Sequence, residues 1–237
     1  MDTFPAEFEA MLSAEGRQLL RGDHPARGAL LREPFYAGTD LLDPRACDGA
    51  LALLDRHFRQ RLVTQFTALP SATSATASHG DHLPKVGRMR FVSNDGVDGF
   101  ITRRLAESCG LLTMLGSASY RAFCEALAGR ALEGPTSRQL LAYRQGDSAG
   151  PHADHHPGEA RMAGGYTDVH LTFCTPGVRD QRIIYAREGH FSEQRSIAAM
   201  GTVTAYRLPV WHYTTPLQAD SPDDLRWLLL GTFLDAP

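Results

Sequence analysis

Apolar residues recur at helical spacing along the first half of the chain. They predict a helix over residues 4–21, which Gly22 and Pro25 would end. Asp43 followed by Pro44 is typical of a helix start, with the aspartate as N-cap and proline in the first turn. Further helical periodicity covers residues 99–132, and two extended runs predict strands at residues 33–41 and 88–93.

The pattern changes in residues 68–87. This segment is rich in Ser, Thr, Ala and Gly and has almost no large apolar side chains. A long loop inside a compact chain is typically either functional, such as a lid over a site, or disordered. Both interpretations stay open at the level of sequence.

From residue 134 onwards, short runs of β-branched and aromatic residues alternate with Gly, Pro, Asp and Ser clusters. Evenly spaced runs of this kind predict a β-sandwich or barrel. The first half would then be a helical support for a β-rich second half. The five predicted strands are RQLLAYR (138–144), DVHLTFC (168–174), QRIIYAR (181–187), GTVTAYRLP (201–209) and RWLLLGTF (226–233).

Length and charge narrow the functional classes. A chain of 237 residues is about the size of one domain, and its net charge of −3 gives no general attraction for nucleic acid. The longest apolar runs are far shorter than the roughly 20 residues of a membrane span. The N-terminus has no basic start followed by an apolar stretch, and the four scattered cysteines form no CxxC pair. We expect a cytoplasmic protein without nucleic-acid or membrane partners.

A histidine-rich segment, GDSAGPHADHHPGE, carries the candidate chemistry. His152 and Asp154 are separated by one residue, so an extended chain places both side chains on one face. An imidazole and a carboxylate on one face supply two metal ligands. His212, at the end of a predicted strand, is the best candidate for the third. Two histidines and one carboxylate suit the open facial triad of non-haem Fe(II) oxygenases, with Zn as the alternative metal.

Arg226 begins an apolar run that contains no other charge until Asp235. Strand alternation aligns it with Leu228 and Leu230, and a buried cation is costly unless an anion meets it. A guanidinium binds a carboxylate at two points. Arg226 could therefore bind a dicarboxylate whose other end reaches the metal.

The ordered set Tyr143, Gly146, His152-Ala153-Asp154, His212 and Arg226 resembles the Fe(II)- and 2-oxoglutarate-dependent dioxygenases. The local order YRQGDSAGPHAD is most similar to their prolyl-hydroxylase-like branch. The resemblance covers about residues 134–237 and implies an α+β protein with a double-stranded β-helix, or jelly-roll, catalytic core. Residues 1–133 would form a helical region with extra strands, packed on the core as one folded unit.

The resemblance also implies roles for individual residues. Fe(II) would be held by His152, Asp154 and His212, and 2-oxoglutarate would meet Arg226 with help from Tyr143. O2 would then be used to oxidise a C–H bond, with loss of CO2 from the co-substrate to give succinate. The presence of Asp154 favours hydroxylation, desaturation or ring closure over halogenation. We expect a small-molecule substrate such as an amino acid or natural-product intermediate.

One spacing departs from the family pattern. Arg226 follows His212 by 14 residues, which is longer than usual, and SPDD at 221–224 would form an enlarged turn. If Arg226 is not the anchor, Arg207 is the alternative.

Two other classes compete with the oxygenase. The letters DHH at 154–156 match a signature of one phosphoesterase group and would indicate a metal-dependent hydrolase. A jelly-roll binding module without catalysis is the other. His155 and His156 fit either a surface turn or a substrate contact, and His170 either a sheet face or the lining of the site. Arg88 and Arg90 fit a solvated face or an anion contact. Nothing in the sequence indicates the oligomeric state.

Overall fold

The computed structural model describes residues 2–68, 86–92, 96–154, 160–162 and 164–236. The helices are η1 (Phe8–Met11), α1 (Ala14–Arg21), α2 (Ala29–Arg32), α3 (Pro44–Phe58), η2 (Arg59–Arg61), α5 (Gly96–Ser108), α6 (Leu111–Leu115), α7 (Ala118–Ala128) and η4 (Ala160–Met162). The strands are β1 (Phe35–Gly38), β2 (Val63–Ala68), β3 (Val86–Val92), β4 (Ser137–Tyr143), β5 (Tyr166–Cys174), β6 (Val178–Asp180), β7 (Arg182–Arg187), β8 (His190–Ser196), β9 (Val203–Leu208), β10 (His212–Thr214), β11 (Gln218–Ala219) and β12 (Arg226–Leu234).

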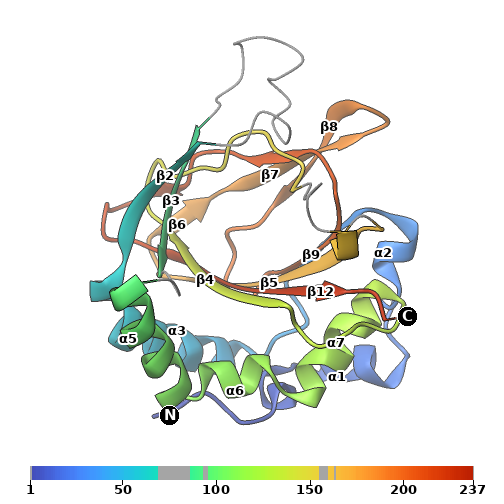
Figure 1. Ribbon diagram of the computed structural model, residues 1–237, viewed down its shortest axis with the longest axis horizontal. Helices are drawn as coiled ribbons and strands as arrows, with labels where there is room; N and C mark the ends of the chain where they lie inside the picture. The colour runs from blue at the N-terminus through green and yellow to red at the C-terminus, as the bar shows by residue number, and fades with distance from the viewer. Residues whose placement is uncertain (1, 69–85, 93–95, 155–159, 163, 237) are drawn as a thin grey trace.

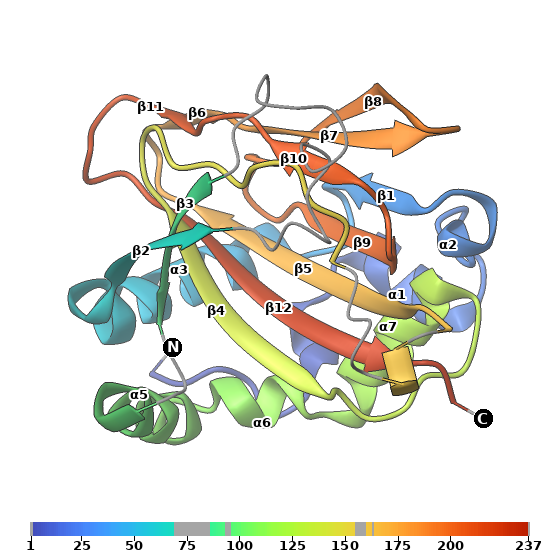
Figure 2. The ribbon, with the colours of Figure 1, turned by 45° about the horizontal axis from the view of Figure 1, so that its top comes forward.

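The strands form antiparallel sheets that face each other. The major sheet has the order β1-β9-β5-β12-β4-β3-β2, and a smaller sheet has the order β10-β7-β8, with the short pair β11-β6 beside it. The helices cover the outer face of the major sheet, and the smaller strands lie on its other side (Figures 1 and 2). The predicted α+β class with a jelly-roll core is confirmed.

Local capping explains where the helices begin and end. Asp43 caps α3, because its Oδ1 accepts a hydrogen bond from the Ala46 amide at 3.0 Å. The single helix predicted over residues 4–21 is wrong: Ser13 caps a new helix, α1, and only a short 3-10 turn precedes it. Helical residues 96–128 divide into three pieces, because Gly110 adopts a left-handed backbone with φ of 80° and Ser117 caps α7.

Strands from the first half complete the major sheet. β1 pairs with β9, with Phe35 opposite Tyr206, and β3 pairs with β4. Both edges of this sheet, β1 and β2, thus come from residues before 134. The sequence did not predict five strands, β2, β6, β8, β10 and β11. β6, β10 and β11 are short, and β8 is largely exposed. Most of the predicted 68–87 loop lies outside the described residues.

The main apolar core fills the space between the helices and the major sheet. Trp227, Leu229 and Phe233 of β12 alternate toward the helices and are fully buried. The Trp227 indole Nε1 also donates to Asp55 Oδ1 of α3 at 2.7 Å. The opposite face of β12 carries Leu228 and the guanidinium group of Arg226. Arg226 therefore lies on the side of β12 that faces the smaller strands. In the described part of the chain, no helix is long and apolar enough to cross a membrane.

Candidate metal centre

His152 and His212 are held side by side by a backbone bridge. The amide of each residue donates to the carbonyl of the other, at 3.0 and 2.8 Å. Their ring centroids are 4.3 Å apart. The bridge extends the smaller sheet, since His212 begins β10 and pairs with Tyr185 of β7. Two residues that are 60 positions apart in sequence therefore meet through strand pairing.

Both histidine rings are oriented by main-chain carbonyls. Nδ1 of His152 lies 2.6 Å from the Gly150 carbonyl oxygen, and Nδ1 of His212 lies 2.8 Å from that of Val210. A carbonyl oxygen only accepts, so each Nδ1 carries the proton and each Nε2 presents a lone pair. This arrangement is typical of imidazoles that bind a metal through Nε2.

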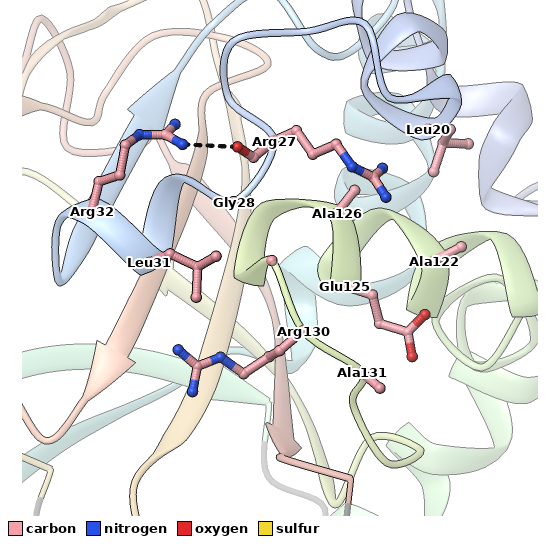
Figure 3. A pocket seen from close by; sticks show the side chains of 11 residues that line it. Leu20, Arg27, Gly28, Leu31, Arg32, Ala122, Glu125, Ala126, Arg130 and Ala131 are labelled. Atoms are coloured by element: carbon pink, nitrogen blue, oxygen red, sulfur yellow. Dashed lines mark hydrogen bonds between the residues drawn. The ribbon is translucent and has the colours of Figure 1, made fainter.

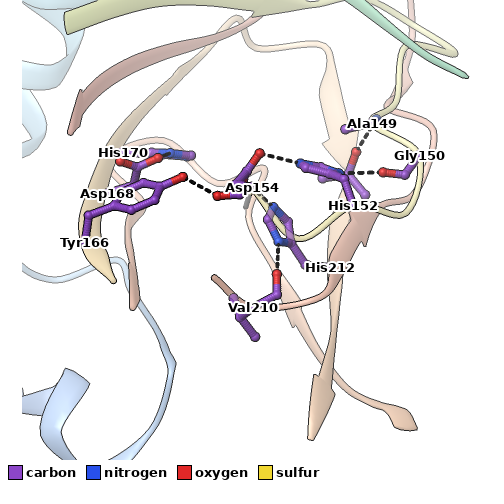
Figure 4. A network of polar contacts seen from close by, with 10 residues as sticks. Ala149, Gly150, His152, Asp154, Tyr166, Asp168, His170, Val210 and His212 are labelled. Carbon is purple, nitrogen blue, oxygen red and sulfur yellow. Dashed lines mark hydrogen bonds and ion pairs between the residues drawn. The ribbon is translucent and has the colours of Figure 1, made fainter. Parts of the chain in front are cut away.

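Asp154 brings a carboxylate to the two imidazoles. Its oxygens lie 3.4 Å from Nε2 of His152 and 3.6 Å from Nε2 of His212 (Figure 4). One donor atom from each of the three residues lies within 4.8 Å of the others. Asp154 has a φ of 50°, and Tyr166 donates to its carbonyl oxygen at 2.6 Å. Aspartate tolerates this left-handed backbone better than most residues.

The three groups influence each other's ionisation. Burial opposes the charge of Asp154, but the hydrogen bond and charge of His152 and the charge of His212 outweigh it and lower its pKa. Burial, together with the neighbouring His152, lowers the pKa of His212 to about 4. Burial also opposes the charge of His152, but the hydrogen bond and charge of Asp154 and the Gly150 carbonyl together outweigh burial and raise its pKa. An anionic carboxylate and a neutral His212 are the forms that bind a cation.

Arg226 lies in the same inter-sheet space and is 2% exposed. Its Nε donates to the Ile197 carbonyl at 2.9 Å. Nη1 donates to Gln181 Oε1 at 3.0 Å, and Nη2 donates to Thr172 Oγ1 at 3.1 Å. A guanidinium has five N–H donors, and these three hydrogen bonds use three of them and fix its plane. One N–H on each terminal nitrogen is left for a ligand.

Tyr143 lies against Arg226. The guanidinium carbon is 5.5 Å from the centroid of the phenol ring, and the two residues face each other in the β4–β12 register. Burial raises the pKa of Tyr143, and the charge of Arg226 partly opposes that shift. The structure thus places the two residues expected to bind a co-substrate next to each other.

Arg207, the alternative anchor, is directed elsewhere. It donates from both terminal nitrogens to the Asp235 carboxylate, at 3.0 and 2.9 Å, and to the Gly164 carbonyl. The SPDD segment is a closed turn before β12, in which Asp224 accepts from the Ser221 amide and from Thr175 Oγ1. The short strand β11 and this turn account for the long separation between His212 and Arg226.

The structure places only some of the other histidines and of the candidate arginines. His155 and His156 lie outside the described residues, and so do the side chains of Arg88 and Arg90. His190 begins β8 and is exposed. His170 lies on β5, and its ring is 4.7 Å from the Tyr206 ring, which in turn contacts the His212 ring.

Three residues contact Arg226 or His212 but belong to no motif in the sequence: Thr172, Gln181 and Tyr206. Thr172 and Tyr206 lie on the inner faces of predicted strands, so alternation from His170 could have found Thr172. Gln181 lies at the junction of β6 and β7 and belongs to no motif.

A separate hollow of about 580 Å³ lies among the helices, between α1, α2 and α7 (Figure 3). Its arginines are engaged with the chain itself. Arg32 donates to the carbonyls of Arg27 and Pro25, and Arg130 pairs with Asp235. The hollow lies on the helical side of the major sheet, whereas the triad lies on the other side.

Comparison with known proteins gives a likeness of structure only. No protein-family model and no curated protein matches the chain. A 2OG-Fe(II) oxygenase family oxidoreductase from Burkholderia pseudomallei aligns over 87% of both chains, with 16% identity and a TM-score of 0.53.

Two further solved structures are similar. The non-haem α-ketoglutarate-dependent epimerase SnoN from nogalamycin biosynthesis covers 94% of this chain and 84% of its own, with 17% identity and a TM-score of 0.55. The non-haem monooxygenase ThoJ, as a nickel complex, covers 89% and 77%, with 14% identity and a TM-score of 0.50. The chain therefore has the fold of these non-haem oxygenase structures.

Proposed function

We propose that the protein is an Fe(II)- and 2-oxoglutarate-dependent oxygenase that hydroxylates a C–H bond of a small molecule. The observation that carries the proposal is the convergence of His152, Asp154 and His212. Two imidazole nitrogens and one carboxylate on the same side of a common point leave the opposite positions of a metal open. The SnoN and ThoJ structures, with the same fold, are described as non-haem enzymes.

The triad fits Fe(II), and the oriented Nδ1 protons are the main reason. Each imidazole is fixed by a carbonyl before any metal arrives, so little ordering is needed on binding. Bound iron with 2-oxoglutarate would supply the activation of O2 that C–H oxidation requires. Zn is the competing ion for two histidines and a carboxylate, and it would support hydrolysis through a bound water.

Arg226 and Tyr143 support 2-oxoglutarate as the co-substrate. The guanidinium is held in one plane by Gln181, Thr172 and the Ile197 carbonyl, and it has two N–H groups left. A carboxylate that accepts both would be bound in the bidentate way that arginine favours. In the proposed enzyme, the far carboxylate of 2-oxoglutarate binds here while its other end reaches the triad.

The type of oxidation is the finer part of the proposal. One structure of the same fold is an epimerase and another a monooxygenase, so the fold supports more than one outcome. The carboxylate of Asp154 supports hydroxylation rather than halogenation, because a ligand that fills its position leaves no room there for a halide. A DHH-type hydrolase would need metal ligands in addition to this triad. Among the described residues, His152, Asp154 and His212 form the one cluster that could hold a metal ion.

An anaerobic titration tests the cofactor assignment without knowledge of the substrate. Fe(II) is added to the metal-free protein, followed by 2-oxoglutarate, and the visible charge-transfer band of the chelate is recorded. We expect the band in the wild type and its loss in His212→Ala. His190→Ala serves as the control, because it removes an exposed histidine of β8.

The other outcomes of the titration would each favour a different function. Iron binding without the band would overturn the co-substrate and leave a different iron enzyme. Tight Zn binding with hydrolytic activity would favour the hydrolase. Failure to bind either metal would leave the jelly-roll binding module.

A further inference from the structure

The inner face of β5 connects the two ends of the candidate site. At one end Tyr166 donates to the Asp154 carbonyl, and at the other Thr172 accepts from Arg226. Alternation places Asp168 and His170 between these two contacts, on the same face. Figure 4 shows both side chains together on the side of Asp154 away from His152. Neither residue has a role in holding the metal or the co-substrate.

Ring contacts join this pair to the triad. The centroid of the His170 ring is 4.7 Å from that of Tyr206, and the Tyr206 centroid is 5.4 Å from that of His212. The His212 ring in turn contacts the His152 ring. His170 is therefore separated from a candidate metal ligand, His212, by a single phenol ring.

Asp168 and His170 carry polar atoms that the described residues do not satisfy. Asp168 is 8% exposed, and its Oδ1 is buried without a hydrogen bond to any described residue. Nε2 of His170 is also buried without one. The distance from this nitrogen to Asp168 Oδ2 is 4.0 Å, which is too long for a hydrogen bond. Unsatisfied buried polar atoms cost free energy, so a ligand that binds them is the natural explanation.

The charge around Asp168 indicates the kind of ligand. No arginine or lysine of the described residues is paired with Asp168, and its ionisable neighbour His170 lies 4.0 Å away. Arg226 is bonded to Gln181 and Thr172 instead, and Arg207 to Asp235. A buried carboxylate without a counter-charge favours a cationic partner over a neutral one. The aromatic ring of Tyr166 belongs to the same face of β5 as Asp168 and suits an ammonium group through its π face.

We propose that Asp168 and His170 form a subsite that binds a protonated amine of the substrate. The ammonium group donates to Asp168 Oδ1 and to Nε2 of His170, in the tautomer that leaves this nitrogen free to accept. The substrate class is then a small amine, held so that a carbon near the nitrogen faces the triad. This inference rests on the proposed function, because it takes the triad as the reaction centre.

Matched amine and alcohol probes test the subsite without turnover. The panel pairs 2-phenylethylamine with 2-phenylethanol, tryptamine with tryptophol, and cyclohexylamine with cyclohexanol. Dissociation constants are measured on the whole protein by ligand-observed NMR. We expect at least one amine to bind tenfold or more tightly than its alcohol. Asp168→Asn, which keeps the shape and removes the charge, should abolish that preference.

Two further variants define the site. His170→Phe keeps a ring against Tyr206 but removes the nitrogen, so the amine should bind several-fold more weakly. Asp48→Asn removes an exposed carboxylate of α3 and should change nothing. Asp168→Asn should also unfold at the same or a higher temperature than the wild type, because it removes an uncompensated buried charge.

The results distinguish the subsite from the oxygenase assignment. If no amine is preferred over its alcohol, or if Asp168→Asn keeps the preference, the subsite is overturned even where the Fe(II)–2-oxoglutarate band forms. If the preference depends on Asp168 but the band never forms, the subsite stands as an amine-binding site and the proposed reaction falls.

Discussion

Gln181 holds Arg226 in place and ties it to both halves of the candidate metal centre. Its Oε1 accepts from Arg226 Nη1 at 3.0 Å, while its amide nitrogen donates to the carbonyls of Asp147 and Thr215 at 3.3 and 3.1 Å. Asp147 precedes the segment that carries His152, and Thr215 follows the strand that carries His212. One fully buried amide therefore connects three separate parts of the site.

Replacing Gln181 with leucine should be strongly destabilising. The change leaves the Thr215 carbonyl and one N–H of Arg226 without these partners, while the Asp147 carbonyl keeps the Leu217 amide. We expect a loss of about 3 kcal/mol in the free energy of unfolding. Urea denaturation measures it. Gln194→Leu is a matched control, since Gln194 also accepts from an arginine, Arg182, but on the surface. A similar small loss in both variants would contradict a structural role for Gln181.

Arg226→Leu should separate co-substrate binding from metal binding. Loss of a bidentate, charge-assisted contact of about 3 kcal/mol weakens 2-oxoglutarate binding roughly 100-fold. The affinity for Fe(II) should change by less than about threefold, because Arg226 contacts none of the three candidate ligands. Anaerobic calorimetry measures both affinities.

Two variants control for the loss of charge and for misfolding. Arg207→Leu removes an equal charge from the β9 arginine that pairs with Asp235 and should leave 2-oxoglutarate binding unchanged. Arg226→Lys should retain part of the affinity, because it keeps the charge but not the planar geometry. Loss of iron binding in both Arg226 variants would show that the residue is structural instead.

The contact between Trp227 and Asp55 fastens α3 to the major sheet. Asp55 accepts from the Trp227 indole at 2.7 Å and from Arg59 at 2.7 Å. Asp55→Ala leaves a buried indole N–H without a partner, so we expect a loss of about 2 kcal/mol in unfolding free energy. Asp48→Ala, in the same helix but exposed, should cost less than about 0.5 kcal/mol. Equal effects in thermal unfolding would refute the fastening role.

The sequence predicted the three residues of the triad, but it did not predict residues that contact the site from other strands, such as Gln181. His152 and Asp154 are two residues apart, so their common side follows from local geometry alone, and the Asp43–Pro44 cap likewise acts within one helical turn. Contacts made across the fold leave no such local pattern. Gln181 meets Arg226 only because β7 and β12 belong to facing sheets. The first predicted helix failed for a different reason: the Ser13 cap is local, but it interrupts an apolar periodicity that continues on both sides.

The four cysteines should be unreactive in the folded protein. All are buried and unpaired, and burial raises the pKa of Cys47 and of Cys174 to about 12. The pKa values of Cys109 and Cys124 are raised by burial as well. At pH 8 a pKa near 12 leaves on the order of one thiolate in 10,000, and the thiolate is the reactive form. A disulfide-exchange reagent should label none quickly at pH 8 and all four in urea; rapid labelling of the native protein would contradict this burial.

Residues 1–133 and 134–237, we propose, form one folding unit. The face of β12 that packs on the helices carries Trp227, Leu229 and Phe233, all fully buried, and the Phe233 ring lies 5.7 Å from that of Tyr120 in α7. A fragment of residues 134–237 would expose this whole face and would also lose the edge strands β1 and β2 and their neighbour β3. We expect the isolated fragment to lack a cooperative thermal transition and to aggregate, and co-expression with residues 1–133 to restore a soluble complex that binds Fe(II). Circular dichroism and light scattering make the comparison. A cooperative transition with sheet-like ellipticity in the isolated fragment would instead show that the jelly roll is an autonomous domain.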